Sequence, residues 1–107
     1  MKAINSIRFI PKENQQTEAL RLAQKFLEEH RSGTEQSMIF HIDNGEYVYI
    51  NIWVNIEAFL KRLEQDELFV DVMRPFVKRY DDGEDFHSYS GIELILDQFW
   101  ISQVLVG

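Results

Sequence analysis

The sequence contains no cysteine, and proline and glycine are scarce, with 2 and 5 residues in a chain of 107. Without cysteine there is no disulfide framework, no thiolate nucleophile and no thiolate metal ligand. This composition suits a reducing compartment, and we expect a cytoplasmic protein. No repeat, linker or low-complexity segment interrupts the chain, so residues 1–107 are expected to form a single domain.

Long apolar runs are also missing. No stretch approaches the roughly 20 residues of a membrane-spanning helix, and no signal-peptide pattern opens the chain. Positive charge is sparse, because 11 Lys and Arg residues face 18 Asp and Glu residues, for a net charge of -7. Phosphate backbones are bound by clustered Lys and Arg. Neither a nucleic acid nor a membrane is therefore an expected partner.

Hydrophobic residues, by contrast, make up 45% of the chain and aromatic residues 13%, which are globular values. Their spacing predicts a strand over residues 3–10 ended by Pro11, and a helix over 15–31 with Asn14 as N-cap. A second helical segment is predicted over 56–80, with Asn55 as N-cap. We expect it to break at residues 64–67, with Asp66 as a new N-cap, and to kink near Asp71 to Pro75.

Between the helices lies the sharpest local signal, Asn44-Gly45, which favours a two-residue type I′ hairpin over residues 37–54. An uninterrupted ladder from this turn would place Ile42 opposite Tyr47 and Phe40 opposite Tyr49. A last strand is predicted over 86–97, interrupted or bulged at Gly91. The apolar residues 97–107 are predicted to form a C-terminal arm or an extra strand.

Both faces of the predicted hairpin are apolar. In that register one face carries Met38, Phe40, Ile42, Tyr47, Tyr49, Asn51 and Trp53, and the other carries Ser37, Ile39, His41, Val48, Ile50, Ile52 and Val54. Soluble monomers rarely expose an apolar patch larger than about 300–600 Å². Helices are expected to cover one face and a second copy of the sheet the other, giving a homodimer by sheet-to-sheet packing. We assign the Tyr/Asn/Trp face to the helices, although the reverse assignment stays open.

The resulting order is βαββαβ, a ferredoxin-like α+β fold with an antiparallel sheet. Crossover rules place the first and third strands side by side at the centre of the sheet. We expect these two strands to be parallel to each other.

This order, with the run from Tyr47 to Phe59, resembles the dimeric α+β barrel superfamily, and within it the antibiotic biosynthesis monooxygenase-like group. The run contains an apolar strand, Trp53, the short N-cap residue Asn55, and then Glu57, Ala58 and Phe59 at the start of the helix. The resemblance implies two chains joined face to face, with a pocket between sheet and helices in each. It also implies cofactor-independent oxygenation of aromatic polyketides or, in another branch, haem degradation.

The haem branch uses a histidine ligand that would fall at Val72 or Met73, and no histidine lies between residues 56 and 80. No cofactor is therefore expected. The function implied is a cofactor-independent monooxygenase acting on a small aromatic or polyketide-like molecule. The alternative is a non-catalytic homodimer that binds a small ligand or has only a structural role.

Candidate site residues combine apolar bulk with hydrogen-bonding groups, a mixture that suits a ligand pocket. Asn51 is the candidate for orienting the substrate, and His41 or His87 for the base, since imidazole titrates near neutrality. Tyrosine and tryptophan also commonly fill a sheet core, which is the alternative for Trp53. The histidines show no metal-ligand spacing, so no metal site is predicted. The candidate ligand-binding residues are Asn5, Phe40, Tyr49, Trp53 and Phe76.

Overall fold

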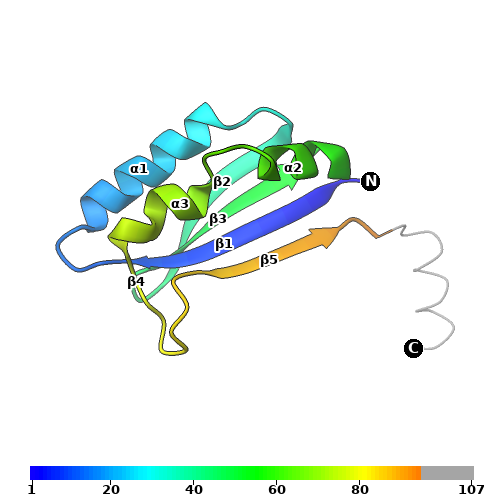
Figure 1. Cartoon of the computed structure of the whole chain (residues 1–107). Coiled ribbons are helices and arrows are strands. Elements are labelled where there is room, and N and C mark those ends of the chain that lie inside the picture. Colours follow the sequence, from blue (N-terminus) through cyan, green and yellow to red (C-terminus); the bar gives the residue numbers. More distant parts are fainter. Residues whose placement is uncertain (95–107) are drawn as a thin grey trace, which may run out of the picture.

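The computed structural model describes residues 1–94 of the chain (Figure 1). The predicted arm at 97–107 and the end of the predicted last strand lie outside the described residues. The elements are β1 (Ala3–Pro11), α1 (Gln16–Glu29), β2 (Thr34–Asp43), β3 (Glu46–Trp53), α2 (Ile56–Leu63), α3 (Phe69–Met73), the 3-10 turn η1 (Arg74–Phe76), β4 (Val77–Lys78) and β5 (His87–Ile92).

The strands form one antiparallel sheet in the order β2-β3-β1, with β5 along most of β1 and the short β4 at its end. The predicted ferredoxin-like α+β fold is confirmed, with β1 and β3 as central neighbours. The prediction that these two strands are parallel was wrong. The crossover through α1 returns the chain for β2, and the tight hairpin then reverses it, so β3 must run antiparallel to β1.

All three helices lie on one side of the sheet (Figure 1). The tyrosines of β3 point toward them, which confirms the assignment of the Tyr/Asn/Trp face to the helices. Phe9 and Met73 are the largest fully buried side chains. They belong to one core cluster shared by sheet and helices: Phe9, Ala19, Ala23, Phe26, Leu27, Tyr47, Tyr49, Phe69, Met73 and Val77.

The hairpin turn has the expected form, since Asn44 and Gly45 have φ angles of 36° and 82°. The predicted register was wrong. A bulge between His41 and Asp43 leaves Ile42 out of the ladder, so that His41 pairs with Tyr47 and Ile39 with Tyr49. Because side chains alternate, this one-residue shift exchanges the two faces of β2. Ile39, predicted for the interface face, instead packs against the core.

Asn51 gives a physical reason for the bulge. It is only 3% exposed, and in the observed register its cross-strand partner is Ser37, whose Oγ donates to Asn51 Oδ1 at 2.6 Å. In the predicted register Met38 would lie opposite Asn51 and offer no comparable partner. A buried polar group left without a partner costs about 1–3 kcal/mol, so the bulged register is favoured.

The second helical segment begins as predicted, with the Asn55 side chain accepting a hydrogen bond from Ala58 N at 2.8 Å. It breaks after α2, also as predicted. Leu68 rather than Asp66 precedes α3, and the helical structure ends in a 3-10 turn at Phe76 rather than at Tyr80. Proline lacks the amide hydrogen that continues a helix, and Pro75 lies within this final turn.

The structure also differs from the prediction at the start of α1 and at Gly91. Asn14 has a left-handed φ of 66° and makes no side-chain cap, so α1 begins after Gln15. Gly33, with φ of 84°, ends the connection from α1, and a Cβ there would lie 3.2 Å from the Ala58 Cβ. β5 pairs with β1 without the bulge predicted at Gly91. No helix of residues 1–94 has the length and apolarity to cross a bilayer.

The side of the sheet away from the helices is called here the open face. Its side chains include those of Ile4, Phe40 and Tyr89, which are 44%, 49% and 66% exposed. Met38, Ile50 and Ile52 occupy the same side by strand alternation. The side chains of this face are therefore largely apolar, as predicted, and no helix of residues 1–94 covers them (Figure 1).

Candidate functional site

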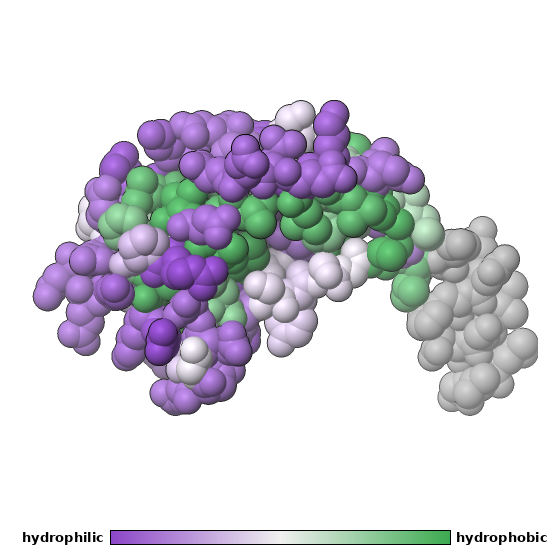
Figure 2. Space-filling view, in the orientation of Figure 1, coloured by the Kyte–Doolittle hydropathy of each residue, from purple (hydrophilic) through white to green (hydrophobic). Residues whose placement is uncertain are grey.

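A cavity of about 290 Å³ lies between the sheet and the α2–α3 segment. Figure 2 shows an apolar band between the polar outer surface of the helices and β5, on the side where this cavity lies. Its volume is at the lower end of the roughly 300–1,000 Å³ typical of ligand pockets. The lining residues are Asn5, Ser6, Ile7, Phe26, Tyr49, Asn51, Trp53, Phe59, Arg62, Leu63, Leu68, Phe69, Val70, Ser88, Tyr89 and Ser90.

Two asparagines form a polar pair on the sheet side of the cavity. Asn5 of β1 and Asn51 of β3 are direct cross-strand partners. The Trp53 indole donates to Asn5 Oδ1 at 2.7 Å, and the Ser37 hydroxyl donates to Asn51 Oδ1 at 2.6 Å. Since each amide oxygen is already engaged, each amide NH₂ group remains as a hydrogen-bond donor. The pair therefore offers donors to a ligand oxygen.

Arg62 of α2 supplies the charge on the helical side. One of its terminal nitrogens, Nη2, donates to the backbone oxygen of Glu67, and its guanidinium lies 5.2 Å from the centre of the Phe26 ring, a cation–π distance. The other terminal nitrogen, Nη1, is buried and has no hydrogen-bond partner among residues 1–94. Two contacts therefore fix the orientation of the guanidinium, while its Nη1 has no hydrogen-bond partner among these residues.

The field of Arg62 reaches His30 at the end of α1, whose ring packs on Phe26 with 4.1 Å between centroids. Burial, and then the positive charge of Arg62, lower the pKa of His30. His30 is therefore neutral at pH 7, and among these two neighbouring groups Arg62 alone is cationic.

Four of the predicted site residues line the cavity: Asn5, Tyr49, Asn51 and Trp53. Their convergence follows from the pairing of β1 with β3, which aligns Asn5 with Asn51 and Ile7 with Tyr49. Phe40 does not join them, because the bulge in β2 turns it to the open face opposite Val48. Its assignment to the pocket rested on the wrong register.

His41 and Phe76 also lie away from the cavity. The His41 ring is stacked on Tyr47, with 4.8 Å between ring centroids, and the residue is exposed. Phe76 packs against the core at the end of the helical segment. The structure gives neither residue a place in the cavity lining.

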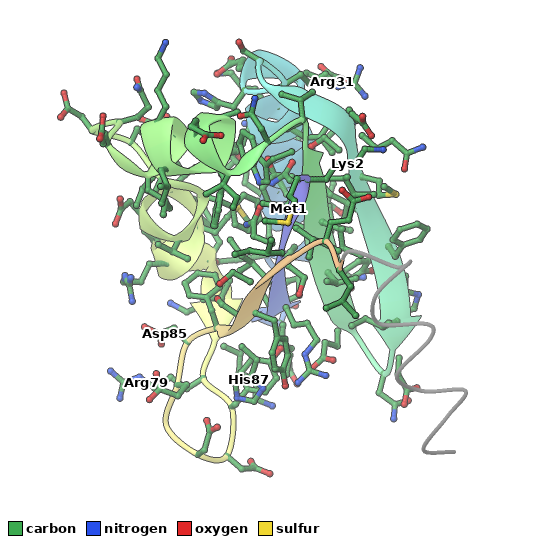
Figure 3. The ribbon with its side chains drawn as sticks, turned by 90° about the vertical axis from the view of Figure 1, so that its right-hand side faces the viewer. Met1, Lys2, Arg31, Arg79, Asp85 and His87 are labelled. Atoms are coloured by element: carbon green, nitrogen blue, oxygen red, sulfur yellow. The ribbon has the colours of Figure 1, made fainter. Side chains whose placement is uncertain are left out.

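His87 belongs to a separate polar cluster at the β4–β5 loop end of the sheet, where Figure 3 labels it near Arg79 and Asp85. It pairs with Arg8 across the sheet on the open face. Its Nδ1 is 3.2 Å from Arg8 Nη2, its Nε2 is 2.8 Å from Asp82 Oδ2, and its ring is stacked on Tyr80. Both ring nitrogens are thus engaged outside the cavity, so the structure does not bring His87 near Asn51.

The sequence did not predict five residues that line the cavity or support its lining: Arg62, Ser37, Phe59, Ser88 and Ser90. A signal for Arg62 was present: it follows Phe59 by three residues, so the two share one face of α2. A charged residue on the inward face of an amphipathic helix is a candidate for ligand binding. Ser37 could not be found without the bulge. Within residues 1–94, no group of three or more His, Asp or Glu side chains is placed to hold a metal ion.

Many solved structures share this arrangement, and several of them are described as antibiotic biosynthesis monooxygenases or candidates for that role. A candidate antibiotic biosynthesis monooxygenase from Deinococcus radiodurans superposes with a TM-score of 0.71 at 12% identity, over 86% of this chain and 92% of the other. One from Nitrosomonas europaea gives 0.68 at 10% identity, over 88% and 91%. This chain has the antibiotic biosynthesis monooxygenase-like fold.

A third match with that fold is SnoaB from Streptomyces nogalater, a cofactor-independent oxygenase whose structure is that of an asparagine-to-alanine mutant. Its TM-score is 0.60 at 14% identity, over 86% of this chain and 92% of SnoaB. No protein-family model matches the chain, and no curated protein matches it. At these identities the likeness shows the shared antibiotic biosynthesis monooxygenase-like fold, and function must be argued from the cavity.

Proposed function

We propose that this protein is a cofactor-independent monooxygenase-like enzyme that acts on a small aromatic or polyketide-like molecule, as a cytoplasmic homodimer. The observation that carries the proposal is the cavity, with an apolar wall and an asparagine pair whose amide groups face it as donors. The shared fold with a cofactor-independent oxygenase supports the same class of chemistry.

The cavity suits a flat ligand. Phe26, Phe59 and Phe69 contribute aromatic surface on the helical side, and Tyr49 and Trp53 contribute it on the sheet side. Aromatic side chains bury large apolar areas and stack on flat rings. With about 290 Å³ available, the cavity favours a ligand of one or two fused rings.

In the proposed reaction the substrate supplies the electrons. A ring CH₂ group beside a phenol or ketone loses a proton, and the resulting carbanion forms a carbon–oxygen bond to dioxygen. The peroxide takes up a proton, the remaining C–H proton leaves, the O–O bond breaks, and water departs to give a ketone. One oxygen atom enters the product and the other becomes water. The protein orients the anion and excludes bulk solvent.

A general base is not found among the described residues that line the cavity, since these include neither a carboxylate nor a histidine. The substrate should therefore be acidic enough to ionise readily. The amide groups of Asn5 and Asn51 would then stabilise its oxygen by hydrogen bonds to the charged form. Asn51 is the residue expected to contribute most, because it is buried whereas Asn5 is only partly buried.

The homodimer is proposed from the open face. Ile4, Phe40 and Tyr89 are exposed on one side of the sheet, and Ile50 and Ile52 adjoin them through the β3 pairing. Apolar sheet faces pack well against each other at a spacing of about 10 Å. A second copy placed there would cover this surface and leave the cavity on the opposite face of each sheet.

The test is oxygen uptake with two-ring substrates of the 2-tetralone type, which carry a ring CH₂ group beside a ketone, followed by mass analysis of products formed under ¹⁸O₂. We expect one labelled oxygen in the product, and a rate about 10²-fold lower for Asn51→Ala, as for the loss of one donor to a developing oxyanion. Gln24→Ala removes an exposed amide from α1 and serves as the control, with an unchanged rate. Equal rates for Asn51→Ala and the wild type would contradict the proposed role.

A non-catalytic binding protein is the second candidate, and the lack of a base in the described cavity lining favours it. It predicts ligand binding in the cavity without oxygen uptake. A purely structural dimer is disfavoured, because it would have no use for an open cavity with unsatisfied donors.

A further inference from the structure

Arg62 is the one charged side chain among the described residues that line the cavity. The chain as a whole carries a net charge of -7, and its acidic groups pair with other cations. Within residues 1–94, the ion pairs involve Lys2, Arg8, Arg21, Lys25, Arg74, Arg79 and His87, but not Arg62. The cavity therefore holds a positive charge that no described carboxylate neutralises.

The unpartnered nitrogen of Arg62 has an energetic meaning. Leaving a buried donor unsatisfied costs about 1–3 kcal/mol, and more for a charged group. Here the cost falls on Nη1, while Nη2 and the Phe26 contact fix the orientation of the guanidinium. Because Arg62 lines the cavity, its oriented guanidinium with one unsatisfied nitrogen favours a ligand atom that can accept hydrogen bonds and carry negative charge.

The sheet side of the cavity also offers hydrogen-bond donors to such a ligand. Asn5 and Asn51 offer amide N–H donors there, since Trp53 and Ser37 occupy their oxygens. Ser88 and Ser90 add hydroxyl groups from β5. Donors thus exceed acceptors around an otherwise apolar space, which favours a ligand whose polar atoms are oxygens without hydrogens.

We propose that Arg62 determines ligand specificity by selecting flat apolar molecules that carry an ionised oxygen: a carboxylate, a phenolate or an enolate. This inference rests on the proposed function insofar as both place the ligand in the same cavity, and it adds the charge class of the ligand. It also supplies what the cavity lacks as an enzyme site, because a guanidinium that stabilises the anion lowers the pKa of the substrate and reduces the need for a base.

Two probes of matched shape test the inference by calorimetric titration of the full chain: 2-naphthoate, which is anionic, and 2-naphthamide, which is neutral. The wild type should bind 2-naphthoate at least about tenfold more tightly, as expected for a charge-assisted hydrogen bond. Arg62→Gln should abolish this preference while leaving the affinity for 2-naphthamide within about twofold. Arg62→Lys should restore only part of it, because an ammonium group lacks the planar fork of donors.

Lys61→Gln is the matched control. It removes one positive charge from the neighbouring position of α2, where the side chain is exposed and outside the cavity lining. The preference for 2-naphthoate should survive this change. Equal losses in Lys61→Gln and Arg62→Gln would mean that net charge rather than a built site governs binding, and the inference would fall.

A second measurement needs no variant. Because the charge of Arg62 lowers the pKa of His30, an anion bound to Arg62 should raise that pKa in an NMR titration, whereas 2-naphthamide should not. Equal binding of the two probes to the wild type overturns the inference and leaves the proposed function standing. Binding of 2-naphthoate without oxygen uptake from any substrate leaves the inference standing and removes the oxygenase. Binding of neither probe removes both.

Discussion

The two faces of this sheet are built from similar residues and have different surroundings. On the covered face, Phe9, Tyr49 and Trp53 are at most 3% exposed beneath the helices. On the open face, Phe40 and Tyr89 are 49% and 66% exposed. Aromatic residues alone therefore do not reveal which face carries the site. The polar pattern does, because two amides with paired oxygens, those of the buried Asn51 and the partly buried Asn5, occur on the covered face.

The two faces also differ in the surroundings of their arginine side chains. On the covered face, Arg62 lines the cavity and has one nitrogen without a described partner. On the open face, Arg8 contacts both Glu46, at 3.6 Å, and His87, at 3.2 Å. Both arginines keep one buried nitrogen without a described partner. The difference is that Arg62 lines the cavity and has no described carboxylate partner, whereas Arg8 is paired with Glu46 outside the cavity.

The largest expected effect comes from removing the same residue type from each face. Phe9→Ala deletes a fully buried ring and should lower the free energy of unfolding by about 3–5 kcal/mol. Phe40→Ala deletes a ring that is 49% exposed within one chain, and should cost much less at protein concentrations low enough to keep the chain monomeric. Urea unfolding measures both. Equal losses for the two variants would show that the faces do not differ as described.

An intermediate effect is expected on association. Phe40→Asp places a charge on the open face and should weaken the proposed dimer by about 10²-fold, since burying an unpaired carboxylate is costly. Sedimentation velocity over a dilution series measures the change. Leu60→Asp is the matched control, because Leu60 is similarly exposed, at 52%, but lies on α2. A dimer that survives Phe40→Asp unchanged would show that the open face is not the interface.

The smallest expected effect is on the pH dependence of the free energy of unfolding, through His30 on the covered side of the sheet. The pKa of His30 is lowered in the folded chain, so the unfolded chain binds the proton more readily. Stability contributed by neutral His30 is present above the unfolded pKa of about 6.5 and is lost as the pH falls toward the folded value. The free energy of unfolding should therefore decline modestly below that pH, and His30→Gln should flatten this decline. An unchanged slope in the variant would assign the pH dependence to other groups.

The sequence correctly predicted the features that are determined by a few neighbouring residues, such as turns and helix caps. Asn44-Gly45 adopts the positive φ angles of its turn, and Asn55 caps α2, because both depend on a few neighbouring residues. The strand order and the helix-facing side of β3 also followed from pattern. Within the site, Asn5, Tyr49, Asn51 and Trp53 lie around the cavity because alternation along β1 and β3 continues without interruption.

The remaining errors arise where a distant contact decides. The register of β2 depends on Ser37 reaching Asn51, 14 residues away in sequence, and Phe40 was misplaced with it. His87 faces away from the cavity because β5 pairs with β1 in a register that aligns His87 with Arg8. The helical period alone extended the second segment to Tyr80, whereas the chain leaves the helix so that Val77 can pair with Pro11.

The bulge at Ile42 has a consequence for insertions and deletions. Since Ile42 stands outside the ladder, with His41 paired to Tyr47 and Asp43 to Glu46, a chain shortened by this one residue could keep every other pairing. Loss of Ile39 instead would shift the residues before it by one position and invert their orientation. Length variation at the tip of this hairpin should therefore be tolerated. The same change a few residues earlier would move buried side chains of β2 to the open face and exposed ones to the covered face.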